Sequence, residues 1–167
     1  FKQTVRECAT LKIVSINDGK IKLNKPFSTE LDPNNFSNLQ FVSLMRNQVL
    51  HASVNTKMTE TWASQIGARE LTNSIAWYLG IEYKNLPEIS NFEQFTALQQ
   101  GTFGKATPFE DADGEKASTW PLTNAFRLPA FKQWMVFLGF GWMSSEILIP
   151  DPEKAILSIL NQIFHED

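Results

Sequence analysis

The chain has 167 residues, a hydrophobic content of 43% and a formal net charge of −3. This length suits one or two small domains, and the composition is ordinary for a soluble globular protein. The single Cys excludes an internal disulfide and favours a reducing, cytoplasmic compartment, and no apolar run reaches the roughly 20 residues of a membrane span.

Residues 1–27 are predicted to form a helix followed by a two-stranded hairpin. The apolar residues Phe1, Val5 and Cys8 follow helical spacing, and residues 14–23 then alternate between apolar and polar side chains. An Asn-Asp-Gly segment interrupts this alternation at its centre, and Asp-Gly is a strong signal for a hairpin turn.

A helix that leads into a hairpin is typical of the end of a winged helix, in which that helix can enter a DNA groove. We therefore expect residues 1–27 to be the C-terminal part of a winged-helix-like domain. Two further helices normally come earlier in this fold, so the domain is expected to begin before Phe1. An amphipathic helix that precedes an unrelated hairpin is the alternative, and the sequence leaves it open.

The charge of the chain is distributed unevenly. Residues 1–27 carry six Lys or Arg against two acids, a balance of +4, whereas the rest of the chain carries −7. Lys2 and Arg6 share one face of the predicted helix, and Lys20 and Lys22 share one face of a strand. These four cations are the candidate DNA-binding residues, directed at phosphates without sequence preference. An ordinary solvated face is the alternative.

Residues 28–167 are predicted to form a second, mainly helical domain after a turn-rich connector. Helical stripes are expected within 36–50 and 56–80, and Gly80 is expected to end the second stripe. A shorter helix is expected around Phe92.

Two segments of this second domain imitate ligand-binding loops without matching them. The stretch from Gly101 to Ala106 lacks the glycine spacing of a phosphate loop, and no Ser or Thr follows its lysine. The polar segment 108–120 looks in part like a calcium loop, but its first and last ligand positions are Phe109 and Trp120. We therefore predict no cofactor, no metal and a solvated acidic loop at 108–120.

The densest apolar run, at 131–156, repeats the pattern found at 1–27. A helical face begins at Phe131, and Gly139 is expected to end it in the left-handed conformation. Two apolar runs around a Ser-Ser-Glu break predict a hairpin, and Asp151 is the expected N-cap of a last helix. Both units begin with Phe-Lys-Gln, one at Phe1 and the other at Phe131, so a second winged-helix-like unit is expected here.

The predicted fold class is therefore mainly α with short β-hairpins, an α+β protein with winged-helix-like units. Large residues on the helical and strand stripes are expected to be mostly buried in its core: Trp77, Leu79, Trp134, Leu138 and Phe140.

The sequence contains no catalytic signature. Two His and one Cys offer no nucleophile–base pair at a recognisable spacing, and no paired metal motif occurs. We therefore predict that the protein is not an enzyme. Two functions remain: DNA binding through the basic N-terminal unit, or protein interaction within a multi-subunit complex without DNA contact. The acidic remainder, five Trp and 13 Phe favour other protein subunits as partners.

Several segments resemble the G component of the Dpd system, the DpdG family. The resemblance lies in the stretches ARELT at 68–72, IAWYL at 75–79, FLGFGW at 137–142 and IPDP at 149–152. Dpd is a bacterial modification and restriction cluster that acts on 7-deazapurines in DNA. The resemblance covers most of the chain and implies an accessory protein of DNA defence with winged-helix modules. It supplies no functional residues.

Overall fold

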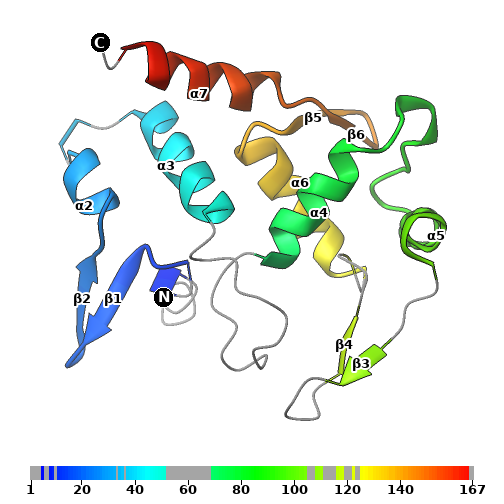
Figure 1. Ribbon diagram of the computed structural model, residues 1–167, viewed down its shortest axis with the longest axis horizontal. Helices are drawn as coiled ribbons and strands as arrows, with labels where there is room; N and C mark the ends of the chain where they lie inside the picture. Colours follow the sequence, from blue (N-terminus) through cyan, green and yellow to red (C-terminus); the bar gives the residue numbers. More distant parts are fainter. Residues whose placement is uncertain are drawn as a thin grey trace. The chain divides into compact units, whose positions relative to one another are not determined.

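The computed structural model describes residues 5, 8–9, 11–32, 34–35, 37–51, 69–104, 108–110, 116–118, 122 and 125–165. The chain divides into two compact units, Phe1–Arg69 (unit 1) and Glu70–Asp167 (unit 2). The described part is mostly helical and contains three two-stranded antiparallel sheets, which confirms the α+β class (Figure 1). The domain limits at 1–27 and 28–167 stay a prediction.

Unit 1 contains the predicted N-terminal hairpin, which is confirmed. Its elements are β1 (Val14–Asn17), β2 (Lys20–Leu23), α2 (Phe27–Glu30) and α3 (Asn38–Leu50). The turn residues Asp18 and Gly19 have φ angles of 50° and 75°, as a type I′ turn requires. Most of the helix predicted before the hairpin lies outside the described residues.

A capping box fixes the start of α3. The Ser37 hydroxyl accepts a hydrogen bond from the Gln40 backbone N–H at 3.1 Å, and the Gln40 side chain accepts one from the Ser37 N–H at 2.8 Å. This arrangement satisfies two N–H groups that the helix itself leaves unpaired. Further along α3, the Gln48 side chain donates to the Leu11 carbonyl at 2.7 Å and ties α3 to the segment before β1.

Unit 2 contains most of the helices. They are α4 (Arg69–Leu79), whose first residue closes unit 1, the 3-10 turn η2 (Tyr83–Asn85), α5 (Phe92–Phe103), α6 (Arg127–Phe137) and α7 (Glu153–His165). The Asp151 carboxylate accepts the Glu153 N–H at 3.0 Å, which confirms the predicted cap of α7.

Two hairpins complete unit 2. They are β3 (Pro108–Glu110) with β4 (Lys116–Ser118), and β5 (Gly141–Ser144) with β6 (Ile147–Pro150). The second hairpin is as predicted. The first replaces part of the loop predicted at 108–120, because such short strands show too little alternation in the sequence.

An aromatic cluster forms the core of unit 2. Tyr78, on α4, stacks on Phe95 from α5 at 5.8 Å and meets Phe131 from α6 edge-on at 5.4 Å. The Tyr78 hydroxyl donates a hydrogen bond of 2.8 Å to the Leu148 carbonyl of β6. Three helices and the β5–β6 hairpin therefore share one core.

The core prediction is partly confirmed. Trp77, Leu138 and Phe140 are buried, whereas Leu79 and Trp134 are only half-buried. Trp134 lies at the edge of a pocket beside α6, so part of its indole stays exposed to solvent.

The two helix–hairpin segments end their helices with the same hydrogen bonds. The N–H of Lys12 bonds to the Ala9 carbonyl and that of Ile13 to the Cys8 carbonyl; in unit 2 the donors are Gly139 and Phe140 and the acceptors Val136 and Met135. Lys12 and Gly139 both have positive φ, 56° and 78°. Each helix therefore ends in a Schellman motif.

The correspondence continues through the hairpins: corresponding residues keep the same separation in the sequence as Lys12 and Gly139. Asn24 donates to the Ile13 carbonyl after the first hairpin, and Asp151 donates to the Phe140 carbonyl after the second. At this offset Phe131 corresponds in the sequence to Thr4 and not to Phe1. The shared Phe-Lys-Gln letters are therefore out of register with the backbone repeat.

Candidate nucleic-acid interface

The first hairpin presents two lysines on one polar face. Its register pairs Lys20 with Asn17 and Lys22 with Ser15. Residues directly opposite on antiparallel strands project to the same face, so these four side chains lie together. Both lysines are exposed. Side chains two residues apart on a strand are separated by about 6.7 Å, so Lys20 and Lys22 can contact the same stretch of DNA backbone.

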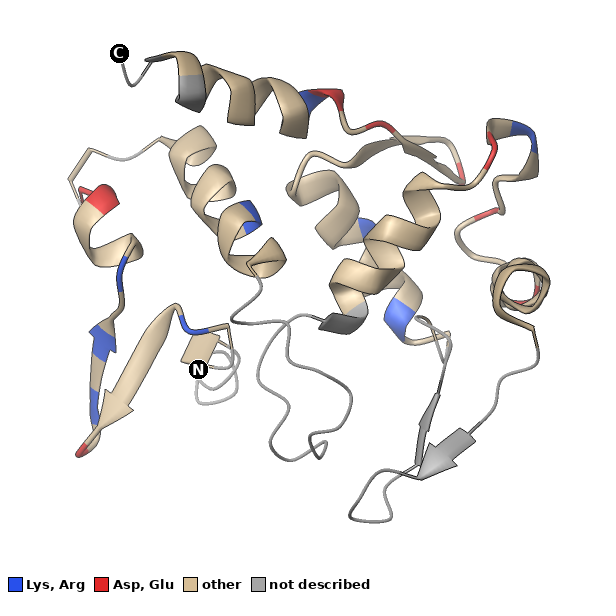
Figure 2. Cartoon of the chain, viewed as in Figure 1, with Lys and Arg blue, Asp and Glu red and all other residues tan. Residues whose placement is uncertain are grey.

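Two more lysines lie at the base of this hairpin. Lys12 and Lys25 are exposed, and the Asn24 side chain donates to the Lys12 carbonyl at 2.9 Å, which holds the two ends of the hairpin together. Figure 2 shows Lys and Arg along β2 and beside both ends of the hairpin, with an acid at its tip. The sequence alone shows only that Lys12 and Lys25 add to the positive charge of residues 1–27, because their closeness to the lysines of β2 depends on the strand register.

Lys2 and Arg6, the other two predicted DNA-binding residues, lie outside the described residues. The charge of unit 1 is nonetheless set by its sequence. Residues 1–69 carry nine Lys or Arg against five Asp or Glu, a balance of +4, whereas residues 70–167 carry six against thirteen, a balance of −7. The first hairpin therefore belongs to a basic unit and the β5–β6 hairpin to an acidic one.

The corresponding face of the β5–β6 hairpin is apolar. When residues of the two hairpins are matched by the sequence separation of Lys12 and Gly139, Ile147 and Ile149 occupy the positions of Lys20 and Lys22. Trp142 replaces Ser15 and is 46% exposed. The same backbone therefore carries a basic surface in unit 1 and an apolar one in unit 2.

The other face of the first hairpin is apolar and largely exposed. Val14 pairs with Leu23 and Ile16 with Ile21. The exposed fractions of Ile16 and Ile21 are 46% and 48%, and that of Leu23 is 39%. The counterpart of Ile21 in unit 2, Leu148, is fully buried.

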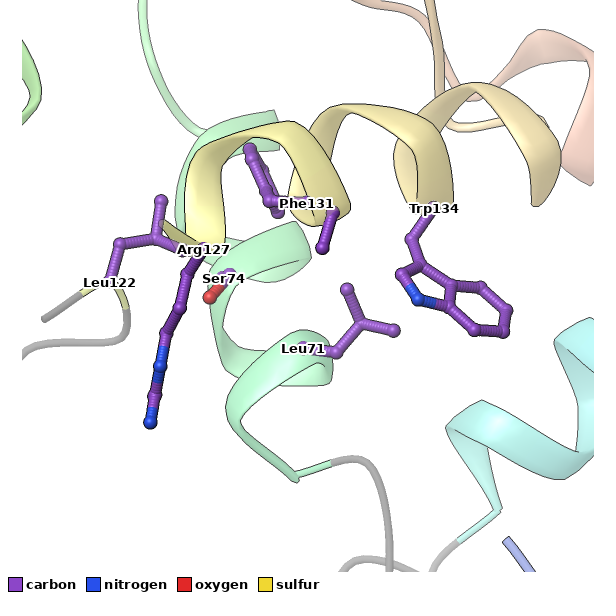
Figure 3. A pocket seen from close by; sticks show the side chains of 7 residues that line it. Leu71, Ser74, Leu122, Arg127, Phe131 and Trp134 are labelled. Carbon is purple, nitrogen blue, oxygen red and sulfur yellow. The ribbon is translucent and has the colours of Figure 1, made fainter. Parts of the chain in front are cut away.

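A pocket of about 200 Å³ lies between α4 and α6. Its lining is mostly apolar and consists of Leu71, Ser74, Leu122, Arg127, Ala130, Phe131 and Trp134. In the view of Figure 3, Leu122 and Arg127 lie at one end of the pocket and Trp134 at the other, with Ser74 and Leu71 between them.

A buried amide holds one wall of this pocket. The side chain of Gln99 is fully buried, and it both donates to the Leu122 carbonyl at 2.9 Å and accepts from the Leu122 N–H at 2.8 Å. This pair of bonds satisfies the backbone of Leu122 as a neighbouring strand would. Because Leu122 is anchored in this way, the wall it forms has a fixed position.

The ionisable groups with shifted pKa values are structural. Burial raises the pKa of Tyr78 far above its ordinary value, and burial lowers the pKa of the Arg46 guanidinium. Among the described residues, no three His, Cys, Asp or Glu lie close enough together to hold a metal ion. In the same part of the chain, no helix is both long and apolar enough to cross a bilayer.

Comparison with known proteins gives one family. The family model described as DpdG-like matches residues 1–167, and so spans both units. No curated protein and no solved structure matches the chain.

Proposed function

Since this chain belongs to the DpdG-like family, we propose that it is a non-catalytic accessory subunit of the Dpd modification system. In this proposal the β1–β2 hairpin contacts DNA phosphates without sequence preference. Unit 2 binds other protein subunits. The protein works in the cytoplasm, where it reaches DNA.

The observation that carries the DNA contact is the polar face of the first hairpin. Lys20 and Lys22 project from it beside Ser15, all three with groups that hydrogen-bond to phosphate oxygens. The repeat in unit 2 has isoleucines at both lysine positions, so the backbone motif itself does not require cations there.

The element order of unit 2 supports a winged-helix-like domain. α4, α5 and α6 precede the β5–β6 hairpin, and the segment between α4 and α5 pairs with it through a bridge from Glu88 to Ile147. The helix before the wing is the one that enters DNA in winged-helix proteins. On α6 and at its N-cap, however, the exposed residues include Phe126, Val136 and Phe137, which suit a protein-binding surface.

The alternative function is a protein-interaction module that never touches DNA. It is favoured by the apolar face of the same first hairpin, where Ile16 and Ile21 are nearly half exposed. An exposed apolar patch of this kind marks an interaction surface. In that case Lys20 and Lys22 form a solvated rim.

Duplex binding across a salt series distinguishes these two functions. Each phosphate contact contributes about 0.9 to the slope of log affinity against log salt. We expect the Lys20→Ala, Lys22→Ala double variant to lose roughly 1.8 from the slope of the parent. The duplex should bind over a range of sequences, because the contacts are to phosphates.

The matched control is the Lys84→Ala, Lys154→Ala double variant. It changes the net charge equally but in unit 2, at two exposed lysines, one of which forms only a surface ion pair of 3.0 Å with Glu82. We expect it to keep the parent slope. An absence of duplex binding by the parent at about 50 mM salt would refute the DNA contact and leave the alternative. So would an equal loss of slope in both variants.

A further inference from the structure

The exposed side of α6 forms an apolar surface. The N-cap residue Phe126 and the helix residues Ala130, Gln133 and Phe137 recur at helical spacing on one side of α6, and all four are exposed. Phe126 is 93% exposed, an unusual fraction for an aromatic side chain in a globular protein. Only Gln133 among these four is polar, so this side of α6 is more apolar than an ordinary solvated face.

This surface is continuous with the pocket between α4 and α6. Ala130 lies on both, since it is exposed and also lines the pocket. Trp134, at one end of the pocket, meets Phe137 edge-on at 5.7 Å. A bound segment can therefore cover the helix surface and insert one side chain into the pocket.

The size of the pocket favours a side chain over a metabolite. Its volume of about 200 Å³ is below the roughly 300–1,000 Å³ of typical small-molecule sites. Phe131 and Leu71 supply apolar walls, and Arg127 supplies a cation at one end. The pocket suits one large apolar side chain with a carboxylate next to it in the sequence.

Charge indicates which kind of partner fits. Unit 2 carries a balance of −7, but α6 has Arg127 and Lys132 and no acid. On a helix of 3.6 residues per turn, Arg127 lies about 90° to one side of the middle of this apolar surface and Lys132 about 130° to the other side. Both cations are half-buried and flank the surface at a distance. A basic helix in an acidic unit is complementary to acidic groups of a partner.

From these observations we infer that α6 and its pocket form the docking site for an acidic segment of a partner protein. The segment carries a large apolar anchor that enters the pocket beside Phe131. Its Asp or Glu side chains meet Arg127 and Lys132. This site is separate from the first hairpin and does not depend on DNA contact by that hairpin.

The test is selection from a library of short random peptides displayed on phage, with the full chain as the immobilised target. We expect enrichment of peptides that combine an aromatic or aliphatic anchor with neighbouring Asp or Glu. Fluorescence anisotropy of labelled synthetic copies then gives their affinities. With Phe126→Ser we expect about a tenfold loss or more, because an exposed aromatic anchor of the site is removed.

The matched control is Tyr83→Ser, which removes another highly exposed aromatic of unit 2 and should leave peptide affinity unchanged. Arg127→Glu should shift the selection towards peptides with Lys or Arg. Since Arg127 is half-buried, circular dichroism checks that the Arg127→Glu variant is folded. Lys132→Glu provides an independent charge reversal on the same helix.

Four results would overturn this inference. Three of them are the absence of any enriched peptide, equal affinities in parent and Phe126→Ser, and selected peptides without acidic residues. A fourth is displacement of the peptide by a short DNA duplex that persists in the Lys20→Ala, Lys22→Ala variant. That result would show that α6 binds DNA independently of the first hairpin.

Discussion

The two helix–hairpin segments have matching backbones but different surroundings. Both helices end in a Schellman motif, and both hairpins close with a backbone bond to the residue just before the first strand. Yet Ile21 is 48% exposed, whereas its counterpart Leu148 is fully buried against the aromatic core of unit 2. Local geometry is therefore repeated, while burial depends on what each unit packs against the hairpin.

The opposite faces of the two hairpins also differ: that of the first hairpin is charged, and that of the second is apolar. The first hairpin has Lys20 and Lys22 there, and the second has Ile147 and Ile149. One segment thus offers cations to solvent and the other an apolar surface. This contrast underlies the proposal that the first hairpin contacts DNA and that unit 2 binds protein partners.

The largest expected effect tests the contrast in burial. Leu148→Ala should lower the free energy of unfolding by about 2–5 kcal/mol, because it leaves a cavity in the core. Ile21→Ala, at the matching position, should cost less than about 1 kcal/mol. Denaturant unfolding followed by far-UV circular dichroism measures both, and similar losses at the two positions would break the comparison.

The second prediction concerns the first residue of each hairpin. A Cβ on Gly141 would lie 2.6 Å from the Ile149 carbonyl oxygen, so the backbone must shift to accept it. Gly141→Ala should therefore destabilise the protein by about 1–3 kcal/mol. The matching residue of the first hairpin is Val14, and Val14→Ala should cost less. Thermal unfolding of the pair checks this, and a neutral Gly141→Ala would show that the second hairpin is as open as the first.

A third prediction tests the bond that holds the second hairpin to α4. Tyr78→Phe leaves the Leu148 carbonyl without the donor it has at 2.8 Å. The expected loss is about 1–3 kcal/mol at neutral pH, measured by urea unfolding. An unchanged midpoint would mean that the hydroxyl contributes nothing to docking of this hairpin.

The same tyrosine predicts an alkaline pH dependence. Burial raises the folded-state pKa of Tyr78 well above the value of about 10 in the unfolded chain. Above that pH the unfolded chain releases the phenolic proton while the folded chain keeps it, so stability falls as pH rises. The slope attributable to this group approaches about 1.4 kcal/mol per pH unit. This slope should appear when the unfolding free energy of Tyr78→Phe is subtracted from that of the parent at each pH.

The smallest expected effect concerns the residue that ends each helix. Lys12 has a φ of 56°, in a region where glycine is unstrained, and the matching residue is Gly139. Lys12→Gly should stabilise the protein by up to about 1 kcal/mol, and Gly139→Ala should destabilise it by roughly as much. Thermal unfolding resolves both signs. A destabilising Lys12→Gly would show that the lysine side chain has a structural contact worth more than the strain.

Much of the secondary structure was predictable because its signals are local. The Asp18-Gly19 turn, the cap by Asp151 and the left-handed Gly139 each depend on neighbours within a few residues. The capping box at Ser37 was missed although its Ser-x-x-Gln pattern is visible in the sequence. The β3–β4 hairpin was missed because its strands are only three residues long.

The candidate surfaces were predicted less completely. The alternation of residues around Lys20 and Lys22 was sufficient to place both on one strand face. Their closeness to Lys12 and Lys25 required the strand register. The pocket could not be predicted, because it brings together Leu71, Leu122 and Trp134 from segments far apart in the chain.

The amino-acid sequence was enough to specify the turns, the helix ends and the uneven charge, because each follows from residue chemistry over a few positions or from composition. Only the folded chain established that Ile21 is exposed while Leu148 is buried, and that the repeat aligns Lys12 with Gly139 rather than Phe1 with Phe131. Burial and register are set by contacts between distant segments. Two hairpins with similar patterns therefore acquire different surfaces according to the core each one meets.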